Sequence, residues 1–430
     1  MGWEGRKRGL LIGLVAVLVA VPAAAVASPT PVTLVPDEVG LVTPLPPQQP
    51  AEGPHGFDYA FPGRPARIGV SGLGGFTAYE PRDEAGEAPA FPVPVVLLLR
   101  GACVGACSMT MTNNIMNAWR DHLAKKGNIV VFPHYQQRDE PELELANVAG
   151  ALHMALRVLG EPGFVAAHPE LAWESDEGAG RAQPDLGRFG IAGHSRGSQM
   201  TVKLAARIFN RGTFAAGTLI EGGATAATLG LPRPDWLLVV EPGPTSFSDF
   251  GDLAALPAAV RLVVVVGEDD TLAGEDKARV IWSSATRIPA VHRDYVRVRS
   301  HRRGPWSFAA LPADGCNAAG ETIALASCAS TNMAWTFTPR QVQAARNVVN
   351  PAAQSGDLVA DHFFPGAGSA LDVYALWKIS QGLVECTGAD GADGGCAIDR
   401  DMGTWSDGVQ VYPLCVTDDP AEDWSASCGN

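Results

Sequence analysis

Apolar and polar residues along this chain fall into blocks whose lengths and periods fit alternating strands and helices. Short apolar runs bounded by polar or glycine-containing segments predict buried strands. Apolar residues that recur every three or four positions predict helices between them. The predicted strands are 66–70, 76–80, 93–99, 128–132, 189–192, 216–220, 236–240, 262–266 and 295–299, and the predicted helices lie near 115–123, 145–159, 200–209, 275–282 and 371–383. This alternation predicts an α/β fold, with a mostly parallel central sheet covered by helices on both faces.

The first residues follow a different pattern, that of a signal peptide. Three basic residues at 6–8 precede an apolar run over 10–27, which ends in the small-x-small sequence of 25–27. Such a segment is typical of a cleaved export signal, so we expect cleavage before Ser28 and a secreted or periplasmic protein. The alternative is a retained membrane anchor, against which Pro22 and the small-residue end argue. After cleavage we expect no membrane span.

Composition divides the rest of the chain into three parts. Residues 28–56 are proline-rich and aperiodic and predict an extended linker. Residues 57–385 hold the predicted sheet and helices and form the expected catalytic domain. Residues 386–430 are rich in glycine, aspartate and cysteine, which predicts a disulfide-rich C-terminal extension on the surface rather than a second domain.

The charge of the chain is strongly acidic. The 430 residues carry a formal net charge of −14 at pH 7, and loss of the signal peptide, which has more basic than acidic residues, leaves the chain acidic. A nucleic-acid surface needs clustered lysine and arginine, so we expect no nucleic-acid partner. We expect the protein to be a monomer.

The eight cysteines predict disulfide bonds, because their number is even and exported proteins meet oxidising conditions. Sequence proximity favours the pairs Cys103–Cys107, Cys316–Cys328, Cys386–Cys396 and Cys415–Cys428. Eight cysteines allow 105 pairings, so the connectivity stays open. The cysteine spacing does not match that of a zinc site, and we expect no metal.

The sequence Gly193-His194-Ser195-Arg196-Gly197 lies between a predicted strand and a predicted helix. A G-x-S-x-G sequence in this context predicts a sharp strand-to-helix turn that presents the serine as a nucleophile. Gly193 and Gly197 are then required for steric reasons, because the turn brings the backbone close to its neighbours. Ser195 is the predicted nucleophile.

A serine hydroxyl needs a histidine that takes its proton and an acid that orients the histidine. For this architecture the expected chain order is serine, acid, histidine, with the groups at the carboxyl ends of strands. Asp270, after the strand 262–266, is the predicted acid, and the adjacent Asp269 is the alternative. Glu221, after 216–220, is less favoured.

His301 is the predicted base, because it follows the strand 295–299 and lies downstream of the acid. His362 is the alternative, while His292 precedes its strand and should lie at the opposite edge of the sheet. The oxyanion of the reaction needs two backbone N–H donors, one after the nucleophile and one in the loop after an early strand. These requirements point to Arg196 and Ala102.

These residues together resemble the α/β-hydrolase superfamily, and within it exported esterases of the dienelactone-hydrolase, chlorophyllase and polyester-hydrolase kind. The sequence G-H-S-R-G at 193–197 is similar to the elbow of chlorophyllase-like members, and the resemblance extends over about 92–301. Arg100 stands where many relatives have histidine. The resemblance implies an acyl-enzyme on Ser195 and no cofactor.

The expected function is therefore the hydrolysis of carboxylic esters, with a small molecule, a lipid or a polyester as substrate. A peptidase or an acyltransferase would use the same machinery, so the fold does not choose among these reactions. A binding protein on a hydrolase scaffold would lack one member of the triad, whereas this sequence offers all three in the expected order.

Overall fold

The computed structural model describes much of the chain between residues 47 and 428. The described residues are 47, 50, 52–56, 58–101, 116, 119–135, 140–176, 181–243, 250–268, 275–303, 306–310, 323–324, 333–334, 336–337, 372–388, 397–405, 407–420, 424 and 428. Contacts divide the chain into two units, Met1–Thr33 and Leu34–Asn430, and every described residue belongs to the second. The predicted signal peptide lies outside the described residues.

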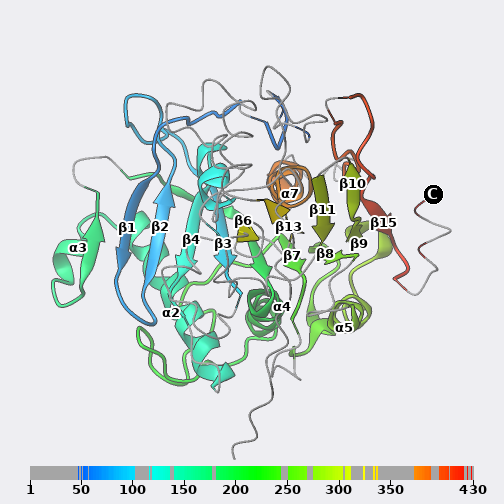
Figure 1. The fold of residues 1–430 in the computed structure, drawn as a ribbon. Coiled ribbons are helices and arrows are strands. Elements are labelled where there is room, and N and C mark those ends of the chain that lie inside the picture. The colour runs from blue at the N-terminus through cyan, green and yellow to red at the C-terminus, as the bar shows by residue number, and fades with distance from the viewer. Residues whose placement is uncertain are drawn as a thin grey trace, which may run out of the picture. The chain divides into compact units, whose positions relative to one another are not determined.

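A ten-stranded sheet forms the centre of this unit (Figure 1). The strand order is β15-β9-β8-β7-β6-β3-β4-β2-β1-β5. The strands are β1 (Ala66–Val70), β2 (Phe76–Glu80), β3 (Val93–Leu99), β4 (Ile129–Pro133), β5 (Trp173–Ser175), β6 (Pro184–His194), β7 (Trp236–Val240), β8 (Arg261–Gly267), β9 (Arg293–Val298) and β15 (Cys415–Thr417).

The middle of the sheet is parallel and its two margins are antiparallel. β4, β3, β6, β7, β8 and β9 pair in parallel, whereas β2, β1 and β5 at one side and β15 at the other pair antiparallel. The carboxyl ends of six neighbouring strands therefore share one edge of the sheet. The predicted α/β class with a mostly parallel sheet is confirmed.

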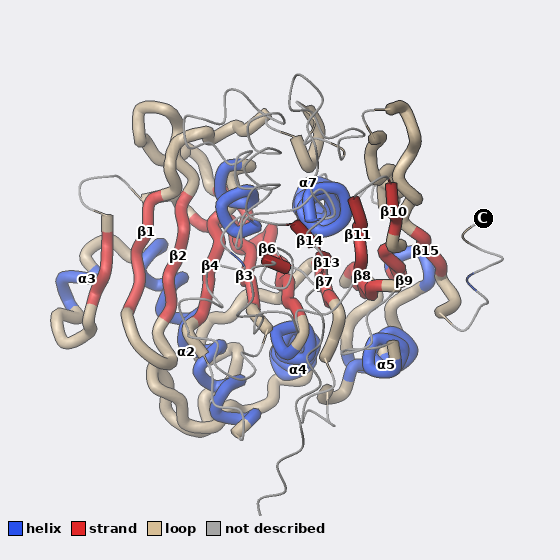
Figure 2. Tube along the Cα trace, viewed as in Figure 1, coloured by secondary structure: helices blue, strands red, loops and turns tan. Residues whose placement is uncertain are grey.

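Helices cover both faces of the sheet (Figure 2). On one face, α2 (Pro141–Gly160), α4 (Arg196–Phe209) and α5 (Asp276–Ser284) share one apolar core with the strands. On the other, the helical residues 119–125, the π-helix η6 (Asp372–Trp377) and α7 (Lys378–Gly388) share a second core. The parallel strands contribute alternate side chains to the two cores, as expected for a sheet buried on both faces.

Shorter elements complete the described fold. They are α3 (Phe164–Ala167), η1 (Leu253–Ala255), η2 (Ala290–His292), β10 (His301–Arg303), β11 (Trp306–Ala310), β12 (Ile323–Ala324), β13 (Met333–Ala334) and β14 (Thr336–Phe337). β10, β11 and β13 form one small sheet, and β12 pairs with β14.

The predicted strand at 216–220 is wrong. These residues form a loop in which Gly217 N–H donates to Ile220 O at 2.9 Å and Thr218 N–H donates to Asn147 Oδ1 at 2.8 Å. A side chain of α2 thus satisfies backbone that a sheet would otherwise pair. β7 consequently follows β6 directly in the sheet.

The C-terminal part is more than the surface extension that its composition predicts. β15 pairs with β9 and adds a strand to the central sheet. Trp405 and Val411 are buried in the same core as α7. Glycine and aspartate set the local loops, but a few spaced apolar residues fix this segment against the domain.

One predicted disulfide lies wholly within the described residues. Cys415 in β15 is bonded to Cys428, as predicted. Cys386 is also disulfide-bonded, and its predicted partner Cys396 lies outside the described part, as do Cys103, Cys107, Cys316 and Cys328. Among the described residues, no helix is both long and apolar enough to cross a membrane.

Candidate active site

Ser195 occupies the turn between β6 and α4, in the middle of the parallel strands (Figure 1). Its backbone has φ of 54° and ψ of −119°, a conformation that costs an L-residue about 1–3 kcal/mol. Residues 191–200 are buried apart from Ser195, which is partly exposed. The strained turn therefore presents the serine outward while its neighbours stay packed, as the motif predicts.

Hydrogen bonds hold this turn against the next strand. The Ser195 N–H donates to the carbonyl of Val240, the last residue of β7, at 2.8 Å. The Ser198 hydroxyl, one turn into α4, accepts from the Val240 N–H at 2.8 Å. Both contacts are with a strand that follows some 40 residues later, so tertiary packing holds the strained conformation.

The two glycines of the motif have the steric role that the sequence predicts. A Cβ on Gly193 would lie 2.4 Å from the carbonyl oxygen of Gly197, and a Cβ on Gly197 would lie 2.2 Å from the carbonyl oxygen of Leu99 at the end of β3. Neither position has space for a side chain. A Cβ on Gly101 would lie 3.1 Å from Cβ of Ser195, so the loop after β3 begins directly beside the nucleophile.

The loop after β7 also lies against Ser195, which the sequence analysis missed. A Cβ on Gly243 would lie 2.9 Å from Ser195 Oγ, and the Gly243 carbonyl accepts a hydrogen bond from the Gln199 side chain of α4. The buried Glu241 has a positive φ of 47°, the second such non-glycine residue at this edge of the sheet. The available signal was an acidic residue directly after the apolar run 236–240.

Glu241 and His194 form a buried pair beside the nucleophile. Oε2 of Glu241 lies 3.5 Å from Nε2 of His194, and both residues are buried. The Nδ1 atom of His194 would lie 3.1 Å from a Cβ on Gly101. His194 thus bridges the loops after β3 and β7 beneath Ser195, in agreement with a role in shaping the turn.

The side chains of the two arginines near the nucleophile point into the protein. Arg196 Nε donates to Oε2 of Glu144 in the first turn of α2 at 2.8 Å. Arg100, directly after β3, donates to the backbone carbonyl of Tyr135. The Arg196 side chain is therefore bound to Glu144 and its backbone lies at the start of α4, whereas Ala102, the other predicted donor, lies outside the described residues.

The predicted acids follow β8, two strands from Ser195. Asp269 and Asp270 lie outside the described residues. The residue before them, Glu268, accepts the Ser300 N–H at 2.8 Å through its carboxylate. This contact joins the segment after β8 to the segment that leads to His301.

His301 lies beyond the end of β9, at the same edge as Ser195, with β7 and β8 between their strands. Its ring stacks on Tyr412 with 4.3 Å between centroids and meets Trp405 edge-on at 5.6 Å. The Tyr412 N–H donates to His301 Nδ1 at 3.2 Å. In this orientation the neutral ring carries its proton on Nε2. The alternative base, His362, lies outside the described residues.

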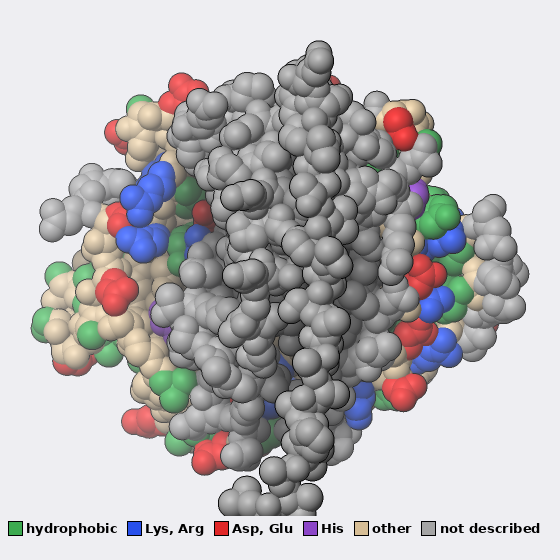
Figure 3. Space-filling view, in the orientation of Figure 1, with side chains coloured by type: hydrophobic (Ala, Val, Ile, Leu, Met, Phe, Trp, Pro, Cys, Tyr) green, Lys and Arg blue, Asp and Glu red, His purple; other side chains and the backbone are tan. Residues whose placement is uncertain are grey.

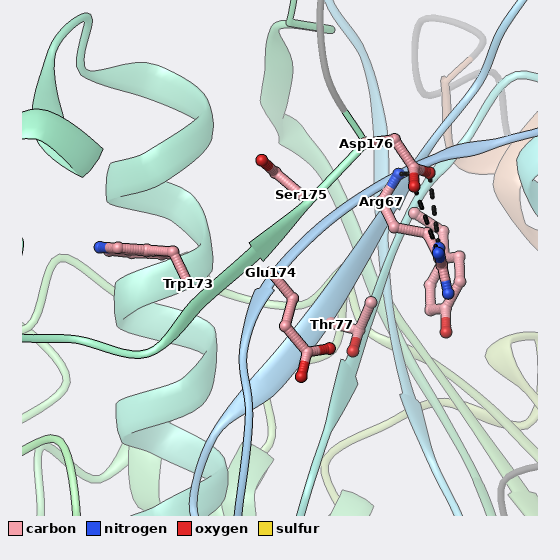
Figure 4. A pocket seen from close by; sticks show the side chains of 7 residues that line it. Arg67, Thr77, Trp173, Glu174, Ser175 and Asp176 are labelled. Carbon is pink, nitrogen blue, oxygen red and sulfur yellow. Dashed lines mark hydrogen bonds and ion pairs between the residues drawn. The ribbon is translucent and has the colours of Figure 1, made fainter.

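A cavity of about 410 Å³ lies elsewhere, over β1, β2 and β5 (Figure 4). Its Arg67 pairs with Asp176 at 3.2 Å, and Trp173 points away from that pair. None of its lining residues comes from the loops beside Ser195.

On the face drawn in Figure 3, basic and acidic side chains lie side by side at the margin that carries β9 and β15. The described residues contain no cluster of histidine, cysteine and acidic side chains that could hold a metal ion.

Comparison with known proteins adds no family assignment. No protein-family model matches the chain, and no curated protein matches it significantly.

Proposed function

We propose that this chain is an exported serine hydrolase of the α/β-hydrolase fold that cleaves carboxylic esters through an acyl-enzyme on Ser195. The observation that carries the proposal is the conformation of Ser195. A partly exposed serine with a strained positive φ, at the carboxyl end of a central parallel strand and the start of a helix, is the arrangement of an activated nucleophile. Strain of this kind persists where surrounding structure enforces it, and it is concentrated at functional sites.

In the proposed reaction, Ser195 Oγ attacks the ester carbonyl while a histidine takes its proton. The backbone N–H groups of Arg196 and Ala102 stabilise the oxyanion, and the tetrahedral intermediate expels the alcohol, which receives the proton from the histidine. Water then attacks the acyl-enzyme in the same way and releases the acid. The reaction needs no cofactor.

His301 is the proposed base and Asp270 the proposed acid. A base for Ser195 needs an unprotonated ring nitrogen that faces the hydroxyl and a protonated one that faces the acid. Because Nδ1 of His301 accepts the Tyr412 N–H, catalysis by His301 requires the ring to turn so that Nδ1 carries the proton toward the acid. His362 is the alternative base, since it also lies after β9 in the chain.

The proposal is tested by Ser195→Ala. Purified wild-type protein should be labelled by a fluorophosphonate and should hydrolyse a short-chain p-nitrophenyl ester, and the variant should do neither above background. Removal of a triad nucleophile lowers kcat by about 10⁶-fold in a well-studied serine hydrolase, so the loss should be complete in practice. Equal turnover by both proteins would show that Ser195 is not the nucleophile.

Separate His301→Ala and His362→Ala variants identify the base. The substitution of the base should lower kcat by several orders of magnitude. Ser283→Ala is the control for Ser195→Ala, because Ser283 is an exposed serine on α5 whose hydroxyl donates to the Val280 carbonyl. A severe loss in His362→Ala alone would assign the base to His362.

A further inference from the structure

A buried polar network holds Arg100 and Arg196, the two arginines near Ser195. Its members are Arg100, Tyr135, Glu144 and Arg196, and each is at most 2% exposed. They come from four separate parts of the chain, namely the ends of β3 and β4, the first turn of α2 and the start of α4. At this depth, water does not compete for the hydrogen bonds.

Tyr135 and Arg100 bind each other reciprocally. The Tyr135 hydroxyl donates to the Arg100 carbonyl at 2.7 Å, and the Arg100 guanidinium donates to the Tyr135 carbonyl. The guanidinium carbon also lies 5.4 Å from the centre of the Tyr135 ring. The loop after β3 is therefore fixed at the residue before Gly101, which packs against Ser195.

Glu144 fixes the other side of the nucleophile. Its carboxylate accepts from both Nε and Nη2 of Arg196, the residue after Ser195. The neighbouring Glu142 pairs with Lys203 and Arg207 further along α4, at 2.7 and 3.0 Å. The first turn of α2 thus holds α4 along its length, and Glu144 holds its first residue.

The Tyr135–Arg100 pair and the Glu144–Arg196 pair also interact through their charges. Burial raises the pKa of the Tyr135 phenol well above its ordinary range, and Arg100, Glu144 and Arg196 all act on that phenol through their charges. The hydroxyl therefore keeps its proton at neutral pH and remains a hydrogen-bond donor there. The Arg100 carbonyl keeps its partner throughout.

We infer that Tyr135 and Glu144 are positioning residues for the oxyanion site. Glu144 holds Arg196, whose backbone N–H is a proposed donor, and Tyr135 holds Arg100, the residue before Gly101 beside Ser195. The inference rests on the proposed function of Ser195. Neither side chain touches the substrate. They act through main-chain atoms, whose alignment depends on the contacts that hold the residues carrying them.

Two isosteric variants test this inference. Tyr135→Phe removes the hydroxyl that binds the Arg100 carbonyl, and Glu144→Gln removes the charge that binds Arg196. The matched controls are Tyr79→Phe on β2 and Glu174→Gln on β5, which make the same chemical changes away from the strand ends beside Ser195. The measurements are kcat and KM for a p-nitrophenyl ester, the inhibition constant of a trifluoromethyl ketone, and the melting temperature.

The inhibition constant of the trifluoromethyl ketone reports on the oxyanion site, because its adduct with Ser195 carries a negatively charged oxygen. Ser195 Oγ adds to its carbonyl carbon, the carbonyl electron pair becomes a negatively charged oxygen, and the hydroxyl proton passes to the base. We expect kcat to fall about 10- to 100-fold in each variant, with KM within about threefold of wild type. The inhibition constant should rise by the same factor as kcat falls, and both controls should stay within about twofold of wild type.

Folded variants with unchanged kcat and unchanged inhibition constant, or with a change in KM alone, would overturn the inference. Loss of folded protein in both variants would overturn it too, because the network would then support the fold rather than the site. If wild-type protein itself fails to react with the fluorophosphonate, the proposed function of Ser195 fails, which is a separate result from either of these.

Discussion

At the scale of single residues, the space around the Ser195 hydroxyl is limited by Gly243. We predict that Gly243→Ala lowers kcat/KM about 100-fold, because the new Cβ would lie 2.9 Å from Oγ and displace the nucleophile. The rate of fluorophosphonate labelling should fall with it. The melting temperature should change little, since the collision is with a side-chain atom at the surface of the turn.

Gly382→Ala is the control for this substitution. Gly382 lies within α7, and a Cβ there meets no atom within 4 Å. Alanine favours the helix by up to about 1 kcal/mol relative to glycine, so this variant should be as active as wild type and at least as stable. Equal activity of both alanine variants would show that the hydroxyl does not need the space beside Gly243.

The sequence predicts only part of the environment of Ser195. The turn at Ser195 and its two glycines are predictable because their requirements are local and lie within one short segment. Glu241 and Tyr135 are not, because their places beside the site depend on which strands are neighbours in the sheet. His301 illustrates the same limit, since its position after β9 follows from the pattern but its contact with Tyr412 joins residues 111 apart.

At the scale of elements, continuous apolar runs predict the central strands well. Runs that are short or interrupted by polar residues predict structure poorly. β3, β7 and β8 are buried along their whole length. The bounds of β3 and β7 match the predicted 93–99 and 236–240, and β8 extends the predicted 262–266 by one residue at each end. Residues 216–220 are a weaker run, interrupted by Gly217 and Thr218, and form a loop in which Asn147 of α2 accepts the Thr218 N–H. β15 escapes prediction for the opposite reason, since three residues in a cysteine-rich segment become a strand through β9.

The disulfide next to β15 allows a prediction about this element. Cys428→Ser opens a link between residues 13 apart, and a loop of about this length contributes about 3 kcal/mol in the chain-entropy account. We therefore expect the free energy of unfolding to fall by up to that amount, as measured by urea denaturation. kcat should be retained at 25 °C, because β15 lies at the margin of the sheet, and an unchanged unfolding midpoint would contradict the prediction.

At the scale of the whole molecule, a buried histidine joins the start of the described chain to its core. His122 Nε2 donates to the Pro54 carbonyl at 3.0 Å, so Nδ1 of the neutral ring accepts from the Tyr59 hydroxyl at 3.3 Å. Its ring stacks on Trp377 of η6. Burial, with a smaller effect of Lys126, lowers the pKa of His122 to about 3.

This lowered pKa makes the stability of the protein dependent on pH. Below about pH 6.5 the unfolded chain binds a proton at His122 that the folded chain excludes until about pH 3, so the free energy of unfolding falls as the pH falls through that window. Between pH 7 and pH 5 this residue should account for a loss of about 2 kcal/mol. In His122→Gln the difference between the two pH values should be smaller by that amount in urea denaturation. Equal differences in the two proteins would rule this explanation out.

The position of β15 in the sequence, far after its partner β9, also affects how the protein is made. β15 is synthesised after β9, and until it arrives the outer edge of β9 offers an unpaired row of N–H and C=O groups to any other strand nearby. A nascent or truncated chain is then exposed to aggregation through that edge.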